Sequence, residues 1–301
     1  MLKQWLKIII FVFFPALLSA GSAYADLRVF ACEPEWSALT QSLGGKHVTL
    51  YTATSNRQDP HHIQARPSLI AKARRADLLV CTGADLEIAW LPLLLRKSAN
   101  TNIQPGRAGY FMASDHVLLL DKPTRLDRSE GDVHAAGNPH IHLDPERILQ
   151  VATRLTHTLI KIDPSNQTDY KQNLSLFTQK WQNKINLWRK QTQALTDKSI
   201  VVHHNSWVYL LQWLGLNQVA TLEPKSGIPP TSAHLSSLLS TLQQKPAHII
   251  VHASYQDAKA ANWLSRKTAI PIVALDFSPA LDESLESWFD RLISQLSGAG
   301  A

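Results

Sequence analysis

Residues 131–145 read GDVHAAGNPHIHLDP and carry three histidines within nine positions. Gly and Pro punctuate the stretch and apolar residues enter only near its end, a pattern typical of a loop that runs into an ordered element. Two histidine pairs, His61-His62 and His203-His204, stand far away in the chain, so 7 of the 13 histidines lie in three short clusters. Such clusters favour a metal site, provided that the fold brings distant loops together.

The first 25 residues have the pattern of a cleavable signal peptide. Lys3 and Lys7 precede an apolar run over residues 8–18, and small residues follow up to Ala25. The apolar run is short for a membrane span, and the A-x-A pattern before Asp26 is typical of a cleavage site. We therefore expect an exported, soluble mature protein over residues 26–301.

Charge and cysteine content narrow the function classes. The formal charge is +6, or +4 without Lys3 and Lys7, and no basic run with interleaved aromatic residues is present. We therefore expect no nucleic-acid partner. Cys32 and Cys81 are the only cysteines. In an oxidising compartment they are compatible with a disulfide, and two separate buried thiols remain equally compatible with the sequence.

Alternating apolar strands and amphipathic helices predict an α/β protein with mainly parallel sheets. The strands expected in the first half cover residues 27–32, 47–51, 76–81 and 116–120, and those in the second half cover 199–202, 218–221, 248–251 and 271–275. Helical spacing marks residues 145–162 and a longer helix over 165–195. We predict a signal peptide (1–25), an N-terminal α/β lobe (26–164), a linker helix (165–195) and a C-terminal α/β lobe (196–301).

Candidate ligands follow predicted strands. His203-His204 come directly after one apolar run, Asp276 comes after another, and His61 lies in the loop after an earlier strand. In open α/β sheets ligands bind beyond the carboxyl ends of the strands, so two lobes that face each other would bring these loops together. Three imidazoles and one carboxylate make a closed tetrahedral zinc site, which suits capture better than catalysis.

Four motifs, in order, resemble the zinc- and manganese-binding solute-binding proteins of bacterial ABC importers. They are Asp59-Pro60-His61, residues 138–145 (NPHIHLDP), residues 204–209 (HNSWVY) and Leu275-Asp276. Residues 84–87 with Trp90, and residues 227–231, match supporting motifs of the same family. The resemblance covers nearly the whole mature chain.

This resemblance implies a metal site between two lobes that a rigid helix joins. The implied ligands are His61, His140, His204 and Asp276. In this family zinc binders tend to carry histidine at the third position and manganese binders a carboxylate, so His204 favours Zn²⁺.

The chain also departs from the family pattern. His142 stands where the family has an aromatic residue, and His134 adds another imidazole to the same loop. Both are possible additional ligands. Some zinc-binding members of the family carry a long acidic, histidine-rich insertion. It is missing here, because the corresponding stretch, residues 127–137, is short.

The resulting expectation is a monomeric periplasmic receptor that binds Zn²⁺ and delivers it to an ABC permease in the inner membrane, with no chemistry of its own. A manganese or iron receptor is the alternative within this class. An exported zinc hydrolase would need an open coordination position and a base, for which Glu130 and Glu223 are nominal candidates. A surface adhesin or metal buffer is the third class.

Overall fold

The computed structural model describes residues 26–124 and 131–300. The predicted signal peptide and Glu130 lie outside these ranges. Within them, no helix combines the length and the apolar character that a membrane crossing requires.

The first sheet consists of four parallel strands in the order β2-β1-β3-β4. Its elements are β1 (Leu27–Ala31), α1 (Pro34–Gly44), β2 (Val48–Thr52), α2 (Pro67–Ala73), β3 (Leu78–Cys81), α3 (Leu91–Ser98) and β4 (Tyr110–Met112). All four residues of β3 are buried, as expected for a central strand that helices cover on both faces.

The sequence predicts a strand over residues 116–120, and this prediction is wrong. The fourth strand comes earlier, where Phe111 and Met112 pair with Val80 and Cys81. After it the chain turns through a short 3₁₀ helix, Ala113–His116. The apolar run that follows has no strand partner among the described residues; it packs partly against the core, and Leu118 is 79% exposed.

The second sheet repeats the same topology, in the order β6-β5-β7-β8, again with all strands parallel. Its elements are β5 (Ser199–Val202), α6 (Val208–Leu214), β6 (Asn217–Thr221), α7 (Ser232–Gln244), β7 (Ile249–Ala253), α8 (Lys259–Thr268) and β8 (Ile272–Leu275). The sequence shows no repeat of fixed period, so the two halves correspond in topology and not in residue pattern.

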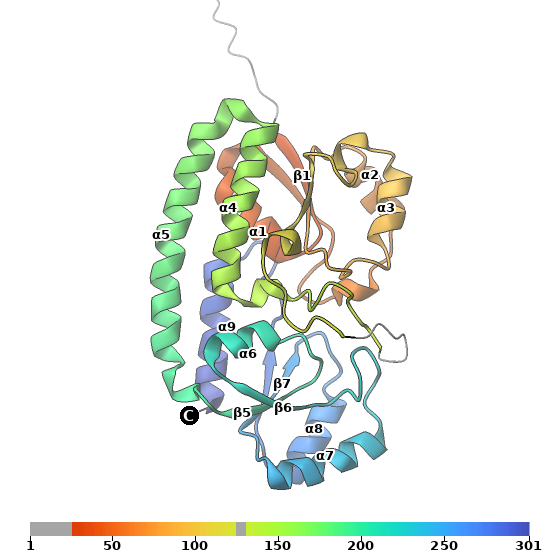
Figure 1. The fold of residues 1–301 in the computed structure, drawn as a ribbon, viewed down its shortest axis with the longest axis vertical. Coiled ribbons are helices and arrows are strands. Elements are labelled where there is room, and N and C mark those ends of the chain that lie inside the picture. Colours follow the sequence, from red (N-terminus) through yellow and green to blue (C-terminus); the bar gives the residue numbers. More distant parts are fainter. Residues whose placement is uncertain (1–25, 125–130, 301) are drawn as a thin grey trace, which may run out of the picture.

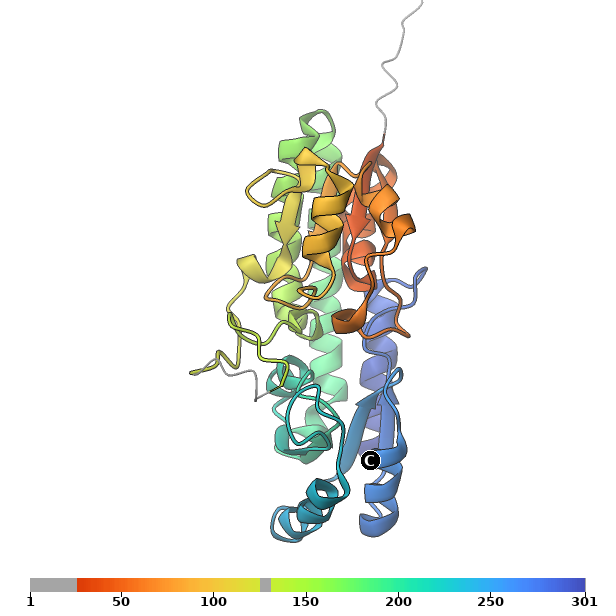
Figure 2. The same ribbon diagram turned by 90° about the vertical axis from the view of Figure 1, so that its right-hand side faces the viewer.

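The chain passes from the first lobe to the second through α5 (Gln167–Gln191), which packs against α4 (Pro145–Ile162) and the C-terminal helix α9 (Leu285–Gly300). Figure 1 shows α5 running along one side of the molecule past both sheets, and Figure 2 gives the view at right angles. With 25 residues, α5 is about 38 Å long at 1.5 Å per residue. It lies inside the predicted linker segment, and 3₁₀ turns flank it at Pro164–Asn166 and Gln193–Leu195.

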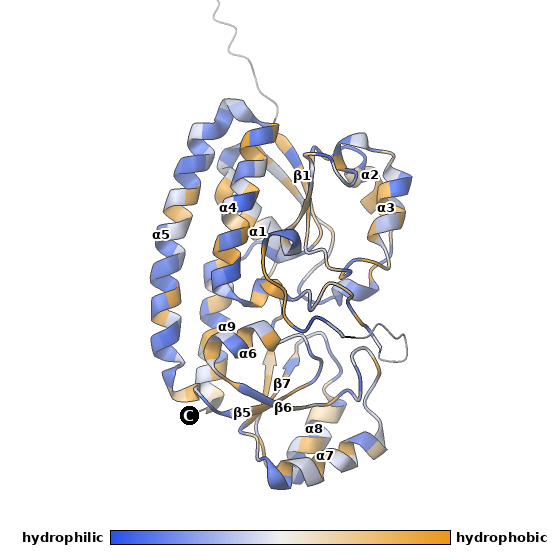
Figure 3. Ribbon diagram, in the orientation of Figure 1, coloured by the Kyte–Doolittle hydropathy of each residue, from blue (hydrophilic) through white to orange (hydrophobic). Residues whose placement is uncertain are grey.

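Aromatic side chains brace this connection. The ring centroids of Trp181 and Trp188 lie 5.1 Å apart, and Trp188 stacks on Phe289 of α9 at 5.0 Å. Trp188 Nε1 also donates to Asp290 Oδ1 at 2.8 Å. In Figure 3 α5 is mostly hydrophilic, with hydrophobic residues at intervals. One cluster of buried hydrophobic residues continues from the first sheet through these helices to the second sheet. The linker is therefore packed along its length, which restricts the relative movement of the lobes.

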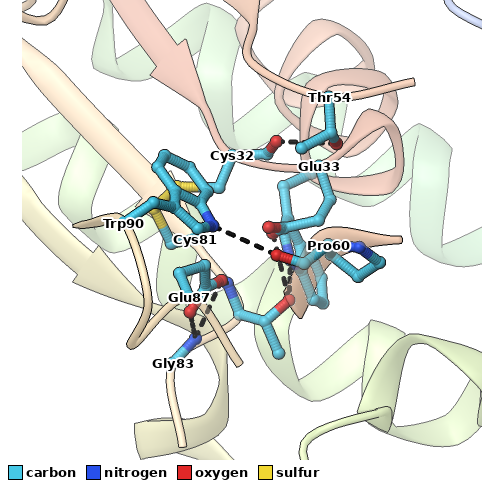
Figure 4. Close-up of a disulfide and its surroundings, with 10 residues drawn as sticks. Cys32, Glu33, Thr54, Pro60, Cys81, Gly83, Glu87 and Trp90 are labelled. Atoms are coloured by element: carbon cyan, nitrogen blue, oxygen red, sulfur yellow. Dashed lines mark hydrogen bonds between the residues drawn. A yellow bond between two sulfur atoms is a disulfide. The ribbon is translucent and has the colours of Figure 1, made fainter. Parts of the chain in front are cut away.

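Cys32 and Cys81 form a disulfide, with their Cα atoms 4.8 Å apart. It joins the carboxyl ends of the neighbouring strands β1 and β3 (Figure 4). Of the two possibilities that the sequence leaves open, the structure has the disulfide.

Candidate metal centre

Three histidines from distant loops converge between the lobes. One ligand nitrogen each from His61, His140 and His204 lies within 4.8 Å of the others. Their ring centroids are 5.4 Å (His61 to His140), 5.8 Å (His61 to His204) and 5.9 Å (His140 to His204) apart. All three side chains are largely buried. The structure thus brings together one histidine from each cluster of the sequence.

His61 is oriented by the loop that carries it. It lies in the 3₁₀ turn Pro60–His62, where Asp59 Oδ1 accepts hydrogen bonds from His61 N at 3.0 Å and from His61 Nδ1 at 2.8 Å. Burial disfavours the charged carboxylate, but these bonds prevail and lower the pKa of Asp59. With Nδ1 bound to Asp59, Nε2 is the nitrogen that remains for a metal. The adjacent His62 is exposed.

The back of this loop rests on the disulfide region. Trp90 Nε1 donates to the carbonyl oxygen of Pro60 at 3.1 Å. Figure 4 shows the indole beside the Cys32–Cys81 bridge, with its N–H directed at Pro60. The disulfide and Trp90 therefore form the base on which the loop of His61 lies.

His204 has a comparable carboxylate partner. Its Nδ1 lies 2.7 Å from Glu223 Oε2, which also accepts from the backbone N–H of Gly227 at 2.9 Å. This arrangement fixes the tautomer with Nε2 free, as in carboxylate–histidine–zinc sites. This role of Glu223 is not predicted from the sequence, where Glu223 is only a nominal candidate for a hydrolase base. The neighbouring His203 points elsewhere: its Nε2 lies 3.7 Å from the other Glu223 oxygen.

His140 is held by a loop that is fastened to the C-terminal lobe. Asn138 Oδ1 accepts from His140 N at 3.1 Å, and Asn138 Nδ2 donates to the carbonyl of Asn205 at 2.7 Å. Tyr209 donates its hydroxyl to the Asn138 carbonyl at 2.6 Å. Burial, and next the imidazoles of His61 and His204, hold the pKa of His140 well below its usual value. The ring is therefore neutral, the form that a metal needs.

Of the two possible fourth donors, His134 contacts one member of the group, His61, and Asp276 is bonded elsewhere. His134 Nε2 is 3.4 Å from His61 Nε2. Burial, followed by the nearby His61 imidazole, lowers the pKa of His134 to about 4. The Asp276 carboxylate instead accepts close hydrogen bonds from Arg291 Nη1 and Ser254 Oγ. Among the described residues, neither Asp276 nor His134 belongs to the group in which every ligand atom lies within 4.8 Å of the others.

His142 lies next to the group, but both of its ring nitrogens face other atoms. Its Nε2 is 3.1 Å from the carbonyl oxygen of Phe277, and its Nδ1 is 3.5 Å from Glu35 Oε1. The ring stacks on Trp288, with centroids 6.0 Å apart. In this arrangement no nitrogen of His142 is turned toward the three converging histidines.

Two α/β lobes that enclose a group of buried imidazoles define a metal-binding receptor with a site in the cleft. The family described as "ZnuA: Zinc-uptake complex component A periplasmic" matches residues 29–298. The chain therefore belongs to this family of substrate-binding transport proteins.

Similar proteins carry names with different metals. The manganese ABC transporter substrate-binding lipoprotein PsaA of Streptococcus pneumoniae is 26% identical over 271 residues, which cover 87% of this chain and 83% of PsaA. The iron ABC transporter substrate-binding lipoprotein MtsA of Streptococcus pyogenes serotype M1 is 23% identical over 261 residues, covering 85% of this chain and 81% of MtsA.

Solved structures show the same fold. A crystal structure of ZnuA superposes with a TM-score of 0.75 at 20% identity. The match covers 92% of this chain and 100% of the ZnuA chain. The Ni²⁺ complex of the solute-binding protein FpvC of P. aeruginosa has a TM-score of 0.74 at 17% identity, covering 91% of this chain and 96% of FpvC. These likenesses confirm the predicted fold of two lobes and a long connecting helix.

Proposed function

We propose that this protein is a periplasmic receptor that captures one Zn²⁺ ion between its lobes and delivers it to an ABC permease in the inner membrane. The observation that carries the proposal is the convergence of His61, His140 and His204, with ligand nitrogens within 4.8 Å of one another. Each comes from a different loop, so the site depends on the complete fold. We propose these three as ligands, with a fourth donor from Asp276 or His134.

Zinc is the favoured cargo because the converging donors are nitrogen atoms. Imidazole suits Zn²⁺, whereas Mn²⁺ prefers carboxylate and carbonyl oxygens. Carboxylates support the site from behind, through Asp59 and Glu223, instead of pointing into it. The relatives named for manganese and iron make those metals the alternative cargo, and a direct comparison of metals decides between them.

Capture fits the geometry better than hydrolysis. A hydrolytic zinc site keeps a position open for water and places a free carboxylate base beside it. Glu223 is not free for that role, because His204 and the N–H of Gly227 already bond to it. We therefore propose a binding protein without catalytic activity, and turnover of ester or peptide substrates would contradict this.

Export and a monomeric state complete the proposal. The family description places its members in the periplasm. The Cys32–Cys81 disulfide fits an oxidising compartment.

A role as a surface adhesin or metal buffer predicts that zinc-limited growth is independent of the gene, whereas a receptor predicts that growth depends on it.

A chelator-competition titration of the metal-stripped protein with Zn²⁺ and Mn²⁺ tests the function. We expect one tight zinc equivalent and much weaker manganese. His140→Ala should weaken zinc binding by at least about 100-fold, because a ligand is lost and not merely its outer partner. His62→Ala is the matched control, since His62 is an exposed neighbour of His61. Zinc binding that survives His140→Ala, or a preference for manganese, would overturn the proposal.

A further inference from the structure

We propose that His134, and not Asp276, is the fourth ligand, so that the site is made of four imidazoles. This inference rests on the proposed function and deepens it. It concerns residues 131–137, called the strap here, which carry His134 into the cleft. Three independent features of the structure support it: the spacing of the nitrogens, the anchoring of the strap and the bonding of Asp276.

The distance between the His134 and His61 nitrogens fits tetrahedral zinc, and His134 would move toward His140 and His204 on metal binding, because its nitrogen is not within 4.8 Å of all three converging nitrogens. His134 Nε2 and His61 Nε2 are 3.4 Å apart. Two nitrogens bound to one tetrahedral Zn²⁺ at 2.0–2.1 Å are separated by about 3.3–3.4 Å. The ring centroids of His134 and His140 lie 6.3 Å apart, so His134 also approaches the second histidine.

The strap is built to hold this position. Asp132 N donates to the carbonyl oxygen of Ser226 at 2.9 Å. Gly131 has φ +85°, and a Cβ there would lie 2.1 Å from that same oxygen. Gly227 has φ +76°, and its Cβ would lie 2.1 Å from Asp132 Oδ2. Only glycine allows the two loops to approach so closely. The strap is therefore docked on the C-terminal lobe, on the same loop that carries Glu223.

The far end of the strap is fastened as well. Gly137 N donates to the carbonyl of His134 at 3.1 Å, and Asn138 N donates to the carbonyl of Leu120 at 2.8 Å. His134 Nδ1 is buried and has no hydrogen-bond partner within the described part of the chain. Its ring therefore makes one polar contact there, Nε2 to His61, and that contact lies at the site.

Asp276 is held away from the site by a network of its own. Arg291 binds Asp276 through Nη1 and binds Glu283 Oε2 through Nη2 at 2.6 Å. Ser254 takes the other Asp276 oxygen. Both bonds would have to break before Asp276 could reach a metal bound at the three histidines.

Replacing the carboxylate by an imidazole changes selectivity. A site of four neutral nitrogens offers no oxygen donor, which disfavours Mn²⁺ more than Zn²⁺. The strap thus adds a fourth nitrogen to the three that already favour zinc.

The test compares zinc and manganese affinities of four variants by chelator competition, each first checked for unchanged thermal unfolding without metal. We expect His134→Ala to weaken zinc by at least about 100-fold and Asp276→Asn by less than about 3-fold, as a ligand and a non-ligand should. His134→Asp should narrow the preference for zinc over manganese. His62→Ala is again the control. X-ray absorption of the zinc-loaded wild-type protein, which needs no variant, should give four imidazoles.

The remaining outcomes separate this inference from the function. Loss of zinc in Asp276→Asn with none in His134→Ala would overturn the inference and leave the receptor intact. Loss in both variants, or three imidazoles plus oxygen by X-ray absorption, would also overturn it, because Asp276 would then belong to the ligand set. Unchanged zinc affinity in His140→Ala would instead overturn the proposed function itself.

Discussion

Glu35 Oε1 lies 3.5 Å from His142 Nδ1, and each side chain is only 1% exposed. Glu35 opens α1 of the N-terminal lobe, and the other nitrogen of His142 contacts the Phe277 carbonyl of the C-terminal lobe at 3.1 Å. The stacking of His142 on Trp288 fulfils the packing role of the aromatic residue that the family resemblance leads one to expect. The histidine adds a polar link between the lobes.

His142→Phe tests this link. The ring packing is kept, but the buried carbonyl of Phe277 loses its contact with His142 Nε2, which should lower the free energy of unfolding by about 1–3 kcal/mol. Urea unfolding of the metal-free protein measures the loss. The zinc stoichiometry should stay at one, and a lost equivalent would mean that His142 is a ligand after all.

Glu223→Gln tests the support of His204. The amide is nearly the same size as the carboxylate, but it no longer fixes the Nδ1–H tautomer as a charged acceptor. We expect zinc affinity to fall by about 10- to 100-fold, the usual effect of losing such a partner. Asp257→Asn is the control, because Asp257 is a carboxylate on the same lobe with a side chain that is 62% exposed. Equal affinities for both variants would show that Glu223 does not position His204.

The stability of the metal-free protein should fall in acid. The pKa of His134 is about 4 in the folded protein and 6.5 ordinarily, and burial is the largest cause. The unfolded chain therefore binds more protons than the folded protein in this window. The stabilising contribution is complete above pH 6.5 and is lost as the pH falls toward 4. It amounts to about 3 kcal/mol at 1.36 kcal/mol per pKa unit.

Urea unfolding at several pH values, on the wild type and on His134→Asn, measures this contribution. The variant should lose less stability between neutral pH and pH 4.5, because one of the histidines with a lowered pKa is gone, while His116, His140, His142 and His203 keep theirs. His140 remains, and carboxylates such as Asp59 titrate in both proteins, so the difference between the two curves isolates His134. If stability fell in parallel with pH in both proteins, the lowered pKa of His134 would be contradicted.

Glu33 should act in the opposite direction. Burial, followed by the charge of Glu87, raises the pKa of Glu33 well above its usual value, and burial raises the pKa of Glu87 to about 7. Here the folded protein binds more protons than the unfolded chain. The stabilising contribution of this carboxyl is therefore complete below pH 4.5 and is lost as the pH rises.

Glu33→Gln removes one of these charges. Glu33 Oε2 accepts from Thr82 Oγ1 at 3.1 Å, and the amide oxygen of glutamine can do the same. We expect the variant to be more stable than the wild type at pH 8 by about 1–3 kcal/mol, with a smaller difference at pH 5. Thermal unfolding of both proteins at the two pH values measures this difference. A stability difference between Glu33→Gln and the wild type that does not depend on pH would show that the substitution removes no charge.

The sequence predicts the fold better than the details of the cleft. The strand and helix periods and the order of the motifs lead to the two lobes, and one histidine from each cluster is found in the converging group. The bonding of Asp276 to Arg291 joins residues 15 positions apart. The pairing of His204 with Glu223 spans 19 positions. Side-chain partners of this kind depend on how loops pack, and periodicity carries no information about them. The short strand β4 is not predicted from the sequence, because a three-residue strand has almost no period to detect.

The disulfide should contribute to stability more than to zinc binding. It closes a sequence separation of 49 residues, which corresponds to about 4 kcal/mol in the chain-entropy account. Urea unfolding of the wild type with and without reductant should show a loss of about this size, and Cys32→Ala/Cys81→Ala should be insensitive to reductant. Zinc affinity is best measured on that double variant, because freed thiols would place ligand atoms within 4.8 Å of Glu87 and bind metal themselves. His61 keeps its bond to Asp59 and Pro60 its bond to Trp90, so we expect affinity to stay within about 3-fold of the wild type. A larger loss would mean that the disulfide itself holds the loop of His61 in its binding position.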